Sequence, residues 1–350
     1  MKVLVAPLNW GLGHATRSMA LVRRYLAQGD EVVLAGDGDS LALMKKTFPA
    51  LRAIPLPHLD IRYSSGKSQV EAMLKNLPRL IRWARADHKA LCDILSLERF
   101  DLIISDNRFG FYVEKPLTQP LPQGEGGISG QPSAVRCIYI THQVFPRLPK
   151  GWHWLEPLAA RLHRRIISHY DELWIPDYQD LSSSLAGELS HGASSGQEST
   201  ISALATRCKY IGPLSRFEGM KVEPDTTYDI VAVLSGPEPQ RTLFEQQLLS
   251  EVRNQEPGIR NQLSADSKVL IVRGKPAAPA TTIRKGNIVF VNHLSDERLA
   301  SYLLGCKQVI CRSGYTSIMD LAALGILAKA DLRPTPGQPE QEYLFQWLNS

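Results

Sequence analysis

Residues 311–325 read CRSGYTSIMDLAALG, and this stretch decides how the fold is interpreted. The apolar run 308–311 predicts a buried strand, and a helical pattern over 316–324 follows it after a short turn that contains glycine. A strand, a tight turn and a helix in this order are typical of a parallel sheet with crossover helices. Small and hydroxylated residues in the turn place backbone donors beside a helix N-terminus, which favours an anion such as a diphosphate.

The side chains of this turn and helix offer contacts to a bound nucleotide. Arg312, Ser313, Gly314 and Thr316 border the turn, and Asp320 lies about one turn into the helix. A carboxylate at that position can accept hydrogen bonds from both hydroxyls of a ribose. The alternative interpretation is a capped helix whose dipole stabilises Asp320.

A proline-bounded loop follows, in which residues 334–343 read PTPGQPEQEY. It contains Gly337 and Gln338 and continues into a helix whose first turn holds Gln341 and Glu342. Such side chains can hydrogen-bond sugar hydroxyls, although an acidic first turn is also ordinary capping.

A third loop of this kind precedes them at residues 234–241, LSGPEPQR. Ser235 and Gly236 can donate to a phosphate, and Arg241 supplies a compensating charge. Loops that follow parallel strands meet at the carboxyl edge of their sheet, where open α/β sheets bind ligands. The three loops are therefore expected to surround one ligand.

A related turn lies near the N-terminus, where GLGHATR occupies residues 11–17. Gly11 and Gly13 allow backbone amides to approach an anion closely, at the start of a predicted helix. In one interpretation His14 points into a cleft as a base or a phosphate contact, with Arg17 close by. In the other, His14 only caps the helix.

This turn also resembles the glycine-rich loop of dinucleotide-binding folds, with Asp37 at about the position of the ribose-binding acid. Thr16 replaces the third glycine, however, and His14 and Arg17 crowd the turn. No cofactor is therefore expected. Residues 37–39 mimic a metal-binding DxD, but an acidic strand-to-helix turn explains them, and no metal ion is expected.

Short apolar runs alternate with helical patterns along the chain, and the pattern restarts after Gly212. This predicts an α/β protein with two Rossmann-like, doubly wound parallel-sheet domains, 1–212 and 229–350, which are joined by a linker at 213–228 and face a cleft. Such a pair describes the GT-B architecture. Strands are predicted over 2–8, 31–35, 101–105, 136–141, 171–175, 229–234, 268–272, 287–291 and 308–311. Helices are predicted over 15–28, 240–253, 296–304 and 316–324.

The composition excludes other classes of protein. The 350 residues suffice for two domains, and a net charge of +5 is too small to indicate a nucleic-acid partner. No apolar run reaches the ~20 residues of a membrane span. The 5 cysteines are scattered and the N-terminus lacks a signal-peptide cleavage site, so a cytoplasmic protein is expected. Surface loops are predicted over 115–135, 187–206 and 254–266.

Taken together, the motifs resemble the family 28 glycosyltransferases, typified by the peptidoglycan N-acetylglucosaminyltransferase that makes lipid II, and more closely an uncharacterised branch of that group. The resemblance is carried by residues 11–17, by Thr141-His142-Gln143, and by residues 311–325 and 334–343. It implies that Asp320 binds the donor ribose and that Gln341 and Glu342 bind the donor sugar. It further implies that Ser235-Gly236 and Ser313-Gly314 bind the diphosphate, and that His142 and Gln143 lie near the acceptor.

The resemblance implies a transferase that moves a hexose or N-acetylhexosamine from a UDP-sugar to an acceptor hydroxyl, inverting the anomeric centre without a metal. His14 is the first choice of base, and His142 and Asp106 are weaker candidates. Two alternatives stay open: a nucleotide-sugar 2-epimerase of the same fold, and an inactive nucleotide-sugar binder.

Two features depart from the family pattern. Residues 326–333 stand where an interior parallel strand is expected, yet they carry Lys329, Asp331 and Arg333, which conflicts with burial on both faces. The chain also ends at Ser350, so the second domain is expected to be truncated.

The N-terminal domain, 1–212, is expected to lie on the acceptor side. It contains two stretches that combine basic and aromatic residues, 75–85 and 151–165. In the second, five apolar residues share one helical face: Trp152, Leu155, Ala159, Leu162 and Ile166. One interpretation is a peripheral membrane contact at the inner membrane face that serves a lipid-linked or polysaccharide acceptor. The other is a helix that packs this stripe inward and leaves its arginines in solvent.

Overall fold

The structure is a computed structural model that describes residues 1–59, 69–114, 135–145, 148, 152–191, 207–254 and 267–349. For residues 69–76, 191 and 252–254 it describes the backbone only. Most of the three predicted loops, 115–135, 187–206 and 254–266, lies outside the described residues.

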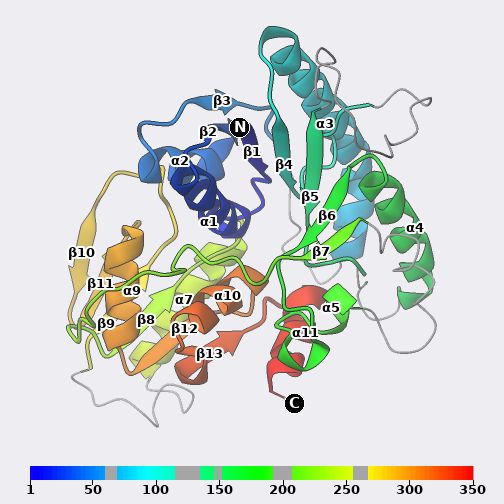
Figure 1. Ribbon diagram of the computed structural model, residues 1–350. Helices are drawn as coiled ribbons and strands as arrows, with labels where there is room; N and C mark the ends of the chain where they lie inside the picture. The colour runs from blue at the N-terminus through cyan, green and yellow to red at the C-terminus, as the bar shows by residue number, and fades with distance from the viewer. Residues whose placement is uncertain are drawn as a thin grey trace.

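The N-terminal half of the chain forms a parallel sheet with helices on both faces (Figure 1). The strand order is β3-β2-β1-β4-β5-β6-β7, and every neighbouring pair is parallel. The strands are β1 (Lys2–Pro7), β2 (Glu31–Gly36), β3 (Ala53–Pro55), β4 (Leu102–Asp106), β5 (Arg136–Ile140), β6 (Glu172–Ile175) and β7 (Cys208–Tyr210). Strand β4 is buried along its whole length and β1 along all but its first residue, as expected for the middle of a parallel sheet.

Two pairs of helices cover this sheet. Side chains of α1 (Gly13–Ala27) and α2 (Gly38–Thr47) pack on one face. Those of α3 (Gln69–Leu97) and α4 (Glu156–Ile167) pack on the other. The short helix α5 (Glu188–His191) and two 3₁₀ turns, η1 (His153–Leu155) and η2 (Leu181–Ser183), complete this half.

The C-terminal half forms a second sheet in the order β10-β11-β9-β8-β12-β13, in which only β10 is antiparallel to its neighbour. Its strands are β8 (Ile230–Val233), β9 (Val269–Val272), β10 (Thr282–Lys285), β11 (Ile288–Val291), β12 (Gln308–Arg312) and β13 (Ala330–Arg333). Its helices are α7 (Gln240–Asn254), α9 (Asp296–Gly305), α10 (Tyr315–Ala323) and α11 (Pro339–Leu348), with a 3₁₀ turn η3 (Leu327–Lys329).

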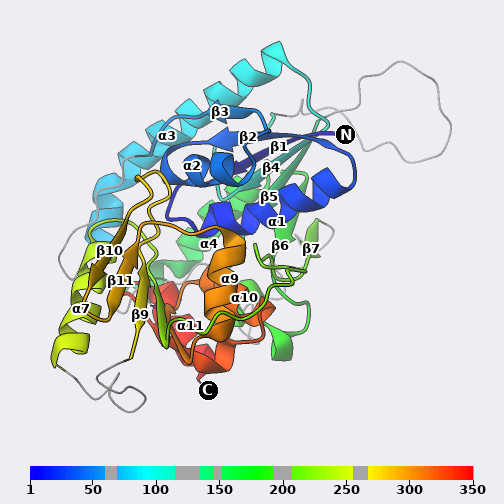
Figure 2. The same cartoon turned by 90° about the vertical axis from the view of Figure 1, so that its left-hand side faces the viewer.

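The predicted fold class is therefore confirmed, since two mostly parallel sheets alternate with helices along the chain. All nine predicted strands and all four predicted helices are present, with ends that differ by one or two residues. Sequence reasoning missed the short strands β3 and β7 and the exposed antiparallel strand β10. Helix α1 lies at the junction of the two halves, next to α10 (Figure 2).

The prediction of an interior strand before Pro334 was wrong. β13 pairs only with β12 and forms one edge of the second sheet, so its charges do not have to be buried on both faces. Arg333 bridges Asp331 and Glu251, at 2.6 Å from each. Lys329 Nζ donates to the carbonyl oxygens of Leu304 and Cys306. An edge position removes the conflict between charge and burial.

Helix α11 packs against the N-terminal half, beside α5 (Figure 1). Tyr343 Oη accepts the Glu188 N–H at 2.8 Å, and Trp347 Nε1 donates to the Ser184 carbonyl at 3.0 Å. A Cβ added at Gly187 would lie 2.6 Å from Tyr343 Oη and 2.7 Å from the Trp347 ring, so these aromatic side chains fit because residue 187 is glycine. The segment after β13 therefore holds both halves together.

Candidate active site

The glycine turns of the two halves are in direct contact. A Cβ added at Gly11 would lie 3.5 Å from the Cα of Gly236, and one added at Gly13 would lie 2.9 Å from Thr316 Oγ1. These turns precede α1, α7 and α10, so the N-termini of α1 and α10 meet at the junction. The first N–H groups of a helix have no partner within that helix, and such groups favour an anion such as a diphosphate.

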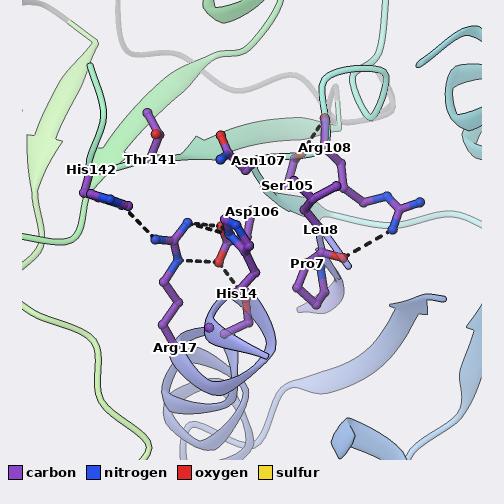
Figure 3. A network of polar contacts seen from close by, with 12 residues as sticks. Pro7, Leu8, His14, Arg17, Ser105, Asp106, Asn107, Arg108, Thr141 and His142 are labelled. Atoms are coloured by element: carbon purple, nitrogen blue, oxygen red, sulfur yellow. Dashed lines mark hydrogen bonds and ion pairs between the residues drawn. The ribbon is translucent and has the colours of Figure 1, made fainter. Parts of the chain in front are cut away.

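A cluster of buried charges lies beside this junction, at the carboxyl end of β4 (Figure 3). Arg17 donates from Nε to Asp106 Oδ2 at 2.7 Å and from Nη2 to Asp106 Oδ1. His14 Nδ1 lies 2.8 Å from Asp106 Oδ1, and Ser18 Oγ donates to Asp106 Oδ2 at 3.1 Å. His14, Arg17 and Ser18 share one face of α1, which delivers all three to a single carboxylate.

The electrostatics of the cluster hold Asp106 ionised. Burial alone would raise the pKa of Asp106, but Arg17 and His14 outweigh it and lower this pKa well below its usual range. The pKa of His14 is lowered, chiefly by burial and partly by Arg17, while Asp106 opposes the shift. With 15% of its side chain exposed, His14 is the member of this trio that solvent or a substrate can reach.

His142 extends the cluster toward the C-terminal half. Arg17 Nη1 lies 3.0 Å from His142 Nδ1, and His142 Nε2 lies 2.9 Å from Glu340 Oε1. An arginine can only donate, so His142 Nδ1 is the acceptor and Nε2–H donates to Glu340. Gln143 Nε2 donates to the second carboxylate oxygen, and the Tyr315 ring stacks on His142 at 4.1 Å.

The predicted ribose ligand, Asp320, is engaged with the segment that links the halves. Its carboxylate accepts from Ser215 Oγ at 2.7 Å and from Arg216 Nε at 3.0 Å. Arg216 also lies 3.5 Å from Asp296, which Arg23 of α1 binds at 2.6 Å. Burial raises the pKa of Asp320, against the lowering effect of Arg216 and Ser215. In this structure Asp320 therefore ties α10 to the linking segment.

The predicted sugar ligands cap their own loop. Gln341 Oε1 accepts the Thr335 N–H and Glu342 Oε1 accepts the Gly337 N–H, both at 2.8 Å. Ser313 Oγ donates to the Gln341 carbonyl at 2.8 Å, so the turn after β12 and the start of α11 adjoin each other. Gln338 stands at the N-cap of α11, where no side-chain cap bond forms.

The remaining predicted residues divide between open and occupied positions. A Cβ at Gly314 would meet nothing within 4 Å, which leaves space in front of the α10 turn. Arg312 is buried, donates to the Pro334 carbonyl at 3.0 Å and covers the Phe244 ring; its pKa is lowered to about 10 by burial and by Arg333. Arg241 Nη1 donates to the Gly274 carbonyl at 2.7 Å, and Nη2 lies 3.1 Å from Glu238. Ser235 is half-buried beside Gly236.

The Asp37 and Asp39 carboxylates, which mimic a metal-binding DxD in the sequence, lie near basic side chains. Asp37 binds the buried Arg108 at 2.9 Å and His58 at 2.6 Å, and Asp39 lies 3.9 Å from Arg241. Within the residues that the structure describes, no group of three or more His, Cys, Asp or Glu side chains could hold a metal ion.

Sequence reasoning missed Glu340, the acidic residue of the second half that reaches the buried cluster. Residues 340–342 form one helical turn with three polar side chains, and nothing in the sequence distinguishes which of them faces the N-terminal half. It also missed Arg17 as the centre of the cluster, because its partners lie 89 and 125 positions away in the chain.

Comparisons with known proteins bear on the fold of the chain. No protein-family model matches the chain. An uncharacterized glycosyltransferase of Methanosarcina acetivorans is 25% identical over 185 residues, which cover 51% of this chain but only 42% of that protein. The match therefore spans less than half of the relative's length.

Solved structures resemble the whole chain. The spinosyn rhamnosyltransferase SpnG has a TM-score of 0.55 at 14% identity and covers 99% of this chain and 84% of its own. The calicheamicin glycosyltransferase CalG4 has a TM-score of 0.54 at 12% identity, with 99% and 83% covered. A Listeria monocytogenes protein described as a UDP-N-acetylglucosamine 2-epimerase has a TM-score of 0.51 at 11% identity, with 100% and 88% covered. The chain thus has the GT-B fold of glycosyltransferases.

Proposed function

We propose that this protein is a glycosyltransferase that moves a sugar from a nucleotide diphosphate-sugar to an acceptor hydroxyl, with inversion and without a metal ion. The observation that carries the proposal is the contact between His14 and Asp106 beside the junction of the two glycine turns. An ionised carboxylate holding a neutral imidazole is the arrangement of a general base. The base therefore stands where a diphosphate and an acceptor would meet.

The protonation state of His14 decides whether it can act. Its Nδ1 faces Asp106, which only accepts, and Arg17 Nη2 at 2.9 Å, which only donates. When Nδ1 carries the proton and donates it to Asp106, Arg17 Nη2 donates to Asp106 Oδ1 and not to His14. Nε2 of His14 then keeps a lone pair that can take the acceptor proton. The acceptor oxygen then attacks the anomeric carbon as the bond to the diphosphate breaks.

The leaving diphosphate needs donors rather than a counter-charge alone. The turns that include Gly11, Gly13, Gly236 and Gly314 would provide backbone N–H groups near the N-termini of α1, α7 and α10. The neighbouring Ser313 N–H already donates to the Arg333 carbonyl at 3.3 Å. We assign the ribose to Asp320, which would exchange its bonds to Ser215 and Arg216 for the sugar hydroxyls. Support for a nucleotide comes from SpnG, which has been crystallised with thymidine diphosphate.

The finer assignment follows the motifs. The resemblance to family 28 favours a uridine nucleotide and a hexose or N-acetylhexosamine, which Gln341 and Glu342 in the first turn of α11 would bind. Thermal unfolding with UDP, TDP, ADP and GDP tests the base, because a ligand that binds only the folded protein raises its unfolding temperature. No shift with any of these at millimolar concentration would contradict the proposal.

Measurements of kcat and KM distinguish a catalytic role of His14 from a structural one. His14→Ala should reduce kcat by about 10²–10⁴-fold and leave the donor KM unchanged, because a general base contributes to the transition state only. His153→Ala is the matched control, since His153 is 56% exposed and bonded only to Glu156 among the described residues. Equal turnover in His14→Ala and wild type would remove His14 from the mechanism.

A 2-epimerase is the second candidate, because a protein described as one is among the structural neighbours. Incubation of the nucleotide-sugar without acceptor distinguishes the two: an epimerase forms a new nucleotide-sugar, whereas a transferase releases nucleotide only slowly. A protein that binds the donor and does neither is an inactive binder.

The acceptor side carries an exposed apolar and basic surface on α4 and the turn before it. Trp154, Leu158 and Leu162 are 72%, 54% and 56% exposed at helical spacing, and the exposed Arg161 and Arg165 flank them. Four residues of the predicted inward stripe are half-buried: Trp152, Leu155, Ala159 and Ile166. Leu162 is exposed, so the prediction of inward packing was wrong for that residue. No helix in the described part of the chain is long and apolar enough to cross a bilayer.

This surface supports a lipid-linked acceptor, reached by peripheral contact with an anionic membrane. Flotation with anionic vesicles should retain the wild-type protein and lose a Trp154→Ser, Leu158→Ser double variant. Leu243→Ser, which alters an apolar residue 46% exposed on α7, is the control and should float normally. Equal flotation of the two variants would exclude α4 as the contact.

A further inference from the structure

We propose that Glu340 is a positioning residue, supplied by the C-terminal half, that makes His14 an effective base by acting through His142 and Arg17. The inference rests on the proposed transferase function for its consequence in catalysis. Its structural part concerns a chain of contacts that exists whether or not the protein transfers sugar.

The contacts form an unbroken path across the two halves. Glu340 Oε1 accepts from His142 Nε2 at 2.9 Å, and His142 Nδ1 accepts from Arg17 Nη1 at 3.0 Å. The same guanidinium donates from Nε and Nη2 to Asp106, whose Oδ1 lies 2.8 Å from His14 Nδ1. Asp106 binds the Nε–Nη2 edge of the guanidinium and His142 binds Nη1, so the two residues together fix its plane.

The charge of Glu340 alters the balance of the cluster. Asp106 and Arg17 cancel one another, so a proton added to His14 would leave a net positive charge in a largely buried site. Glu340 adds one negative charge and thereby offsets the imidazolium that forms when His14 accepts a proton. Burial would raise the pKa of Glu340, but His142, His14 and Arg17 lower it. The same attraction between Glu340 and these groups favours a protonated His14.

The position of Glu340 depends on the docking of α11. Glu340 lies in the first turn of this helix, and Tyr343 and Trp347 attach the helix to Glu188 and Ser184 of the N-terminal half. Tyr315 of α10 stacks on His142 and donates to the Pro176 carbonyl at 2.8 Å, which is a second contact between the two halves beside His142. The base is therefore complete only when the two halves are together.

The experiment compares Glu340→Gln with Glu342→Gln, the matched control on the same helix turn, whose carboxylate caps the Gly337 N–H outside the cluster. Histidine side chains labelled with ¹³C and ¹⁵N report the pKa of His14 and His142 by NMR. In Glu340→Gln the pKa of His14 should fall, because the compensating charge is gone, and Glu340→Asp should restore it in part. Glu342→Gln should leave it unchanged.

Kinetics give the second readout. Glu340→Gln should lower kcat about ten-fold, leave the donor KM unchanged and move the acid limb of kcat/KM to lower pH. A raised KM with unchanged kcat would instead make Glu340 a direct sugar contact. An unchanged His14 pKa in Glu340→Gln would overturn the proposal, and because NMR needs no substrate, this outcome is distinct from failure of the transferase assignment.

Docking is tested with Trp347→Ala against Phe345→Ala, whose side chain is 37% exposed on the same helix. Trp347→Ala should shift the His14 pKa in the same direction as Glu340→Gln, and Phe345→Ala should not. If neither substitution shifts it, the coupling to α11 is excluded.

Discussion

The carboxyl edges of the two sheets carry similar polar side chains and use them differently. At the first sheet, Asp106 is bound by His14, Arg17 and Ser18. The cluster continues through His142 to Glu340 of the other half. At the second sheet, Gln341 and Glu342 bond the backbone of their own loop. The first edge therefore holds a network of buried charges that joins the two halves. The second is a set of capped loops that a ligand would have to rearrange.

The largest expected difference between the edges is in stability. Asp106→Asn leaves the buried Arg17 without its counter-charge, so the free energy of unfolding should fall by about 3–5 kcal/mol in urea denaturation. Glu342→Gln removes a carboxylate that caps an exposed loop and should cost below about 1 kcal/mol. Equal losses would show that the two edges do not differ.

The attachment of α11 should have the next largest effect on stability. Gly187→Ala would place a Cβ 2.6 Å from Tyr343 Oη and should lower the free energy of unfolding by about 1–3 kcal/mol beyond the backbone strain of its positive φ. Gly212→Ala is the control, since its φ is also positive and nothing lies within 4 Å of its Cβ. If the two variants unfold alike, the aromatic contacts of α11 do not hold the halves together.

An effect that is small near pH 6 and grows as the pH falls comes from the loop after β11. Burial, with Lys46 and Arg216, lowers the pKa of His293 to about 4. Below about pH 6.5 His293 is protonated in the unfolded chain but stays neutral in the folded protein. The free energy of unfolding should therefore fall between pH 6.5 and 4, by at most ~1.4 kcal/mol per pH unit. His293→Gln should flatten this slope in urea titrations at pH 7, 6 and 5. His153→Gln, at an exposed position, should keep the wild-type slope.

The smallest effect belongs to the edge strand β13. Asp331→Asn removes a partly exposed ion pair with Arg333, which keeps its second partner Glu251. The expected loss in unfolding free energy is below about 1 kcal/mol. A loss comparable to that of Asp106→Asn would mean that β13 is buried as an interior strand after all.

Much of the fold was predictable, because buried parallel strands are short apolar runs that stand out in the sequence. β4 (Leu102–Asp106) and β9 (Val269–Val272) are buried throughout, and both were predicted. The strands that were missed lie at or near sheet edges, where the apolar pattern weakens: β10 is exposed along its whole length and β3 is three residues long. β13 was predicted as an interior strand because the local composition of a segment does not determine the order of strands in a sheet.

The candidate site was predictable in its residue types and less so in its contacts. His14, Arg17 and His142 were named from motifs and Asp106 as a weaker candidate base. The structure joins these four residues in one hydrogen-bonded network. Their roles in catalysis stay predictions. Asp320, Gln341 and Glu342 were named from the same kind of pattern, but the structure shows that they bond elsewhere. A helix turn offers several side chains, and packing decides which of them reaches the buried cluster.

The sequence by itself determined two α/β halves and the glycine turns that open their helices, since apolar periodicity and backbone freedom are local properties of the chain. Only the tertiary structure decided that Arg17 joins Asp106 to His142, that Glu340 rather than Glu342 faces them, and that β13 is an edge strand. Those outcomes depend on which segments meet in space, and a buried charge selects its partner by distance rather than by position in the chain.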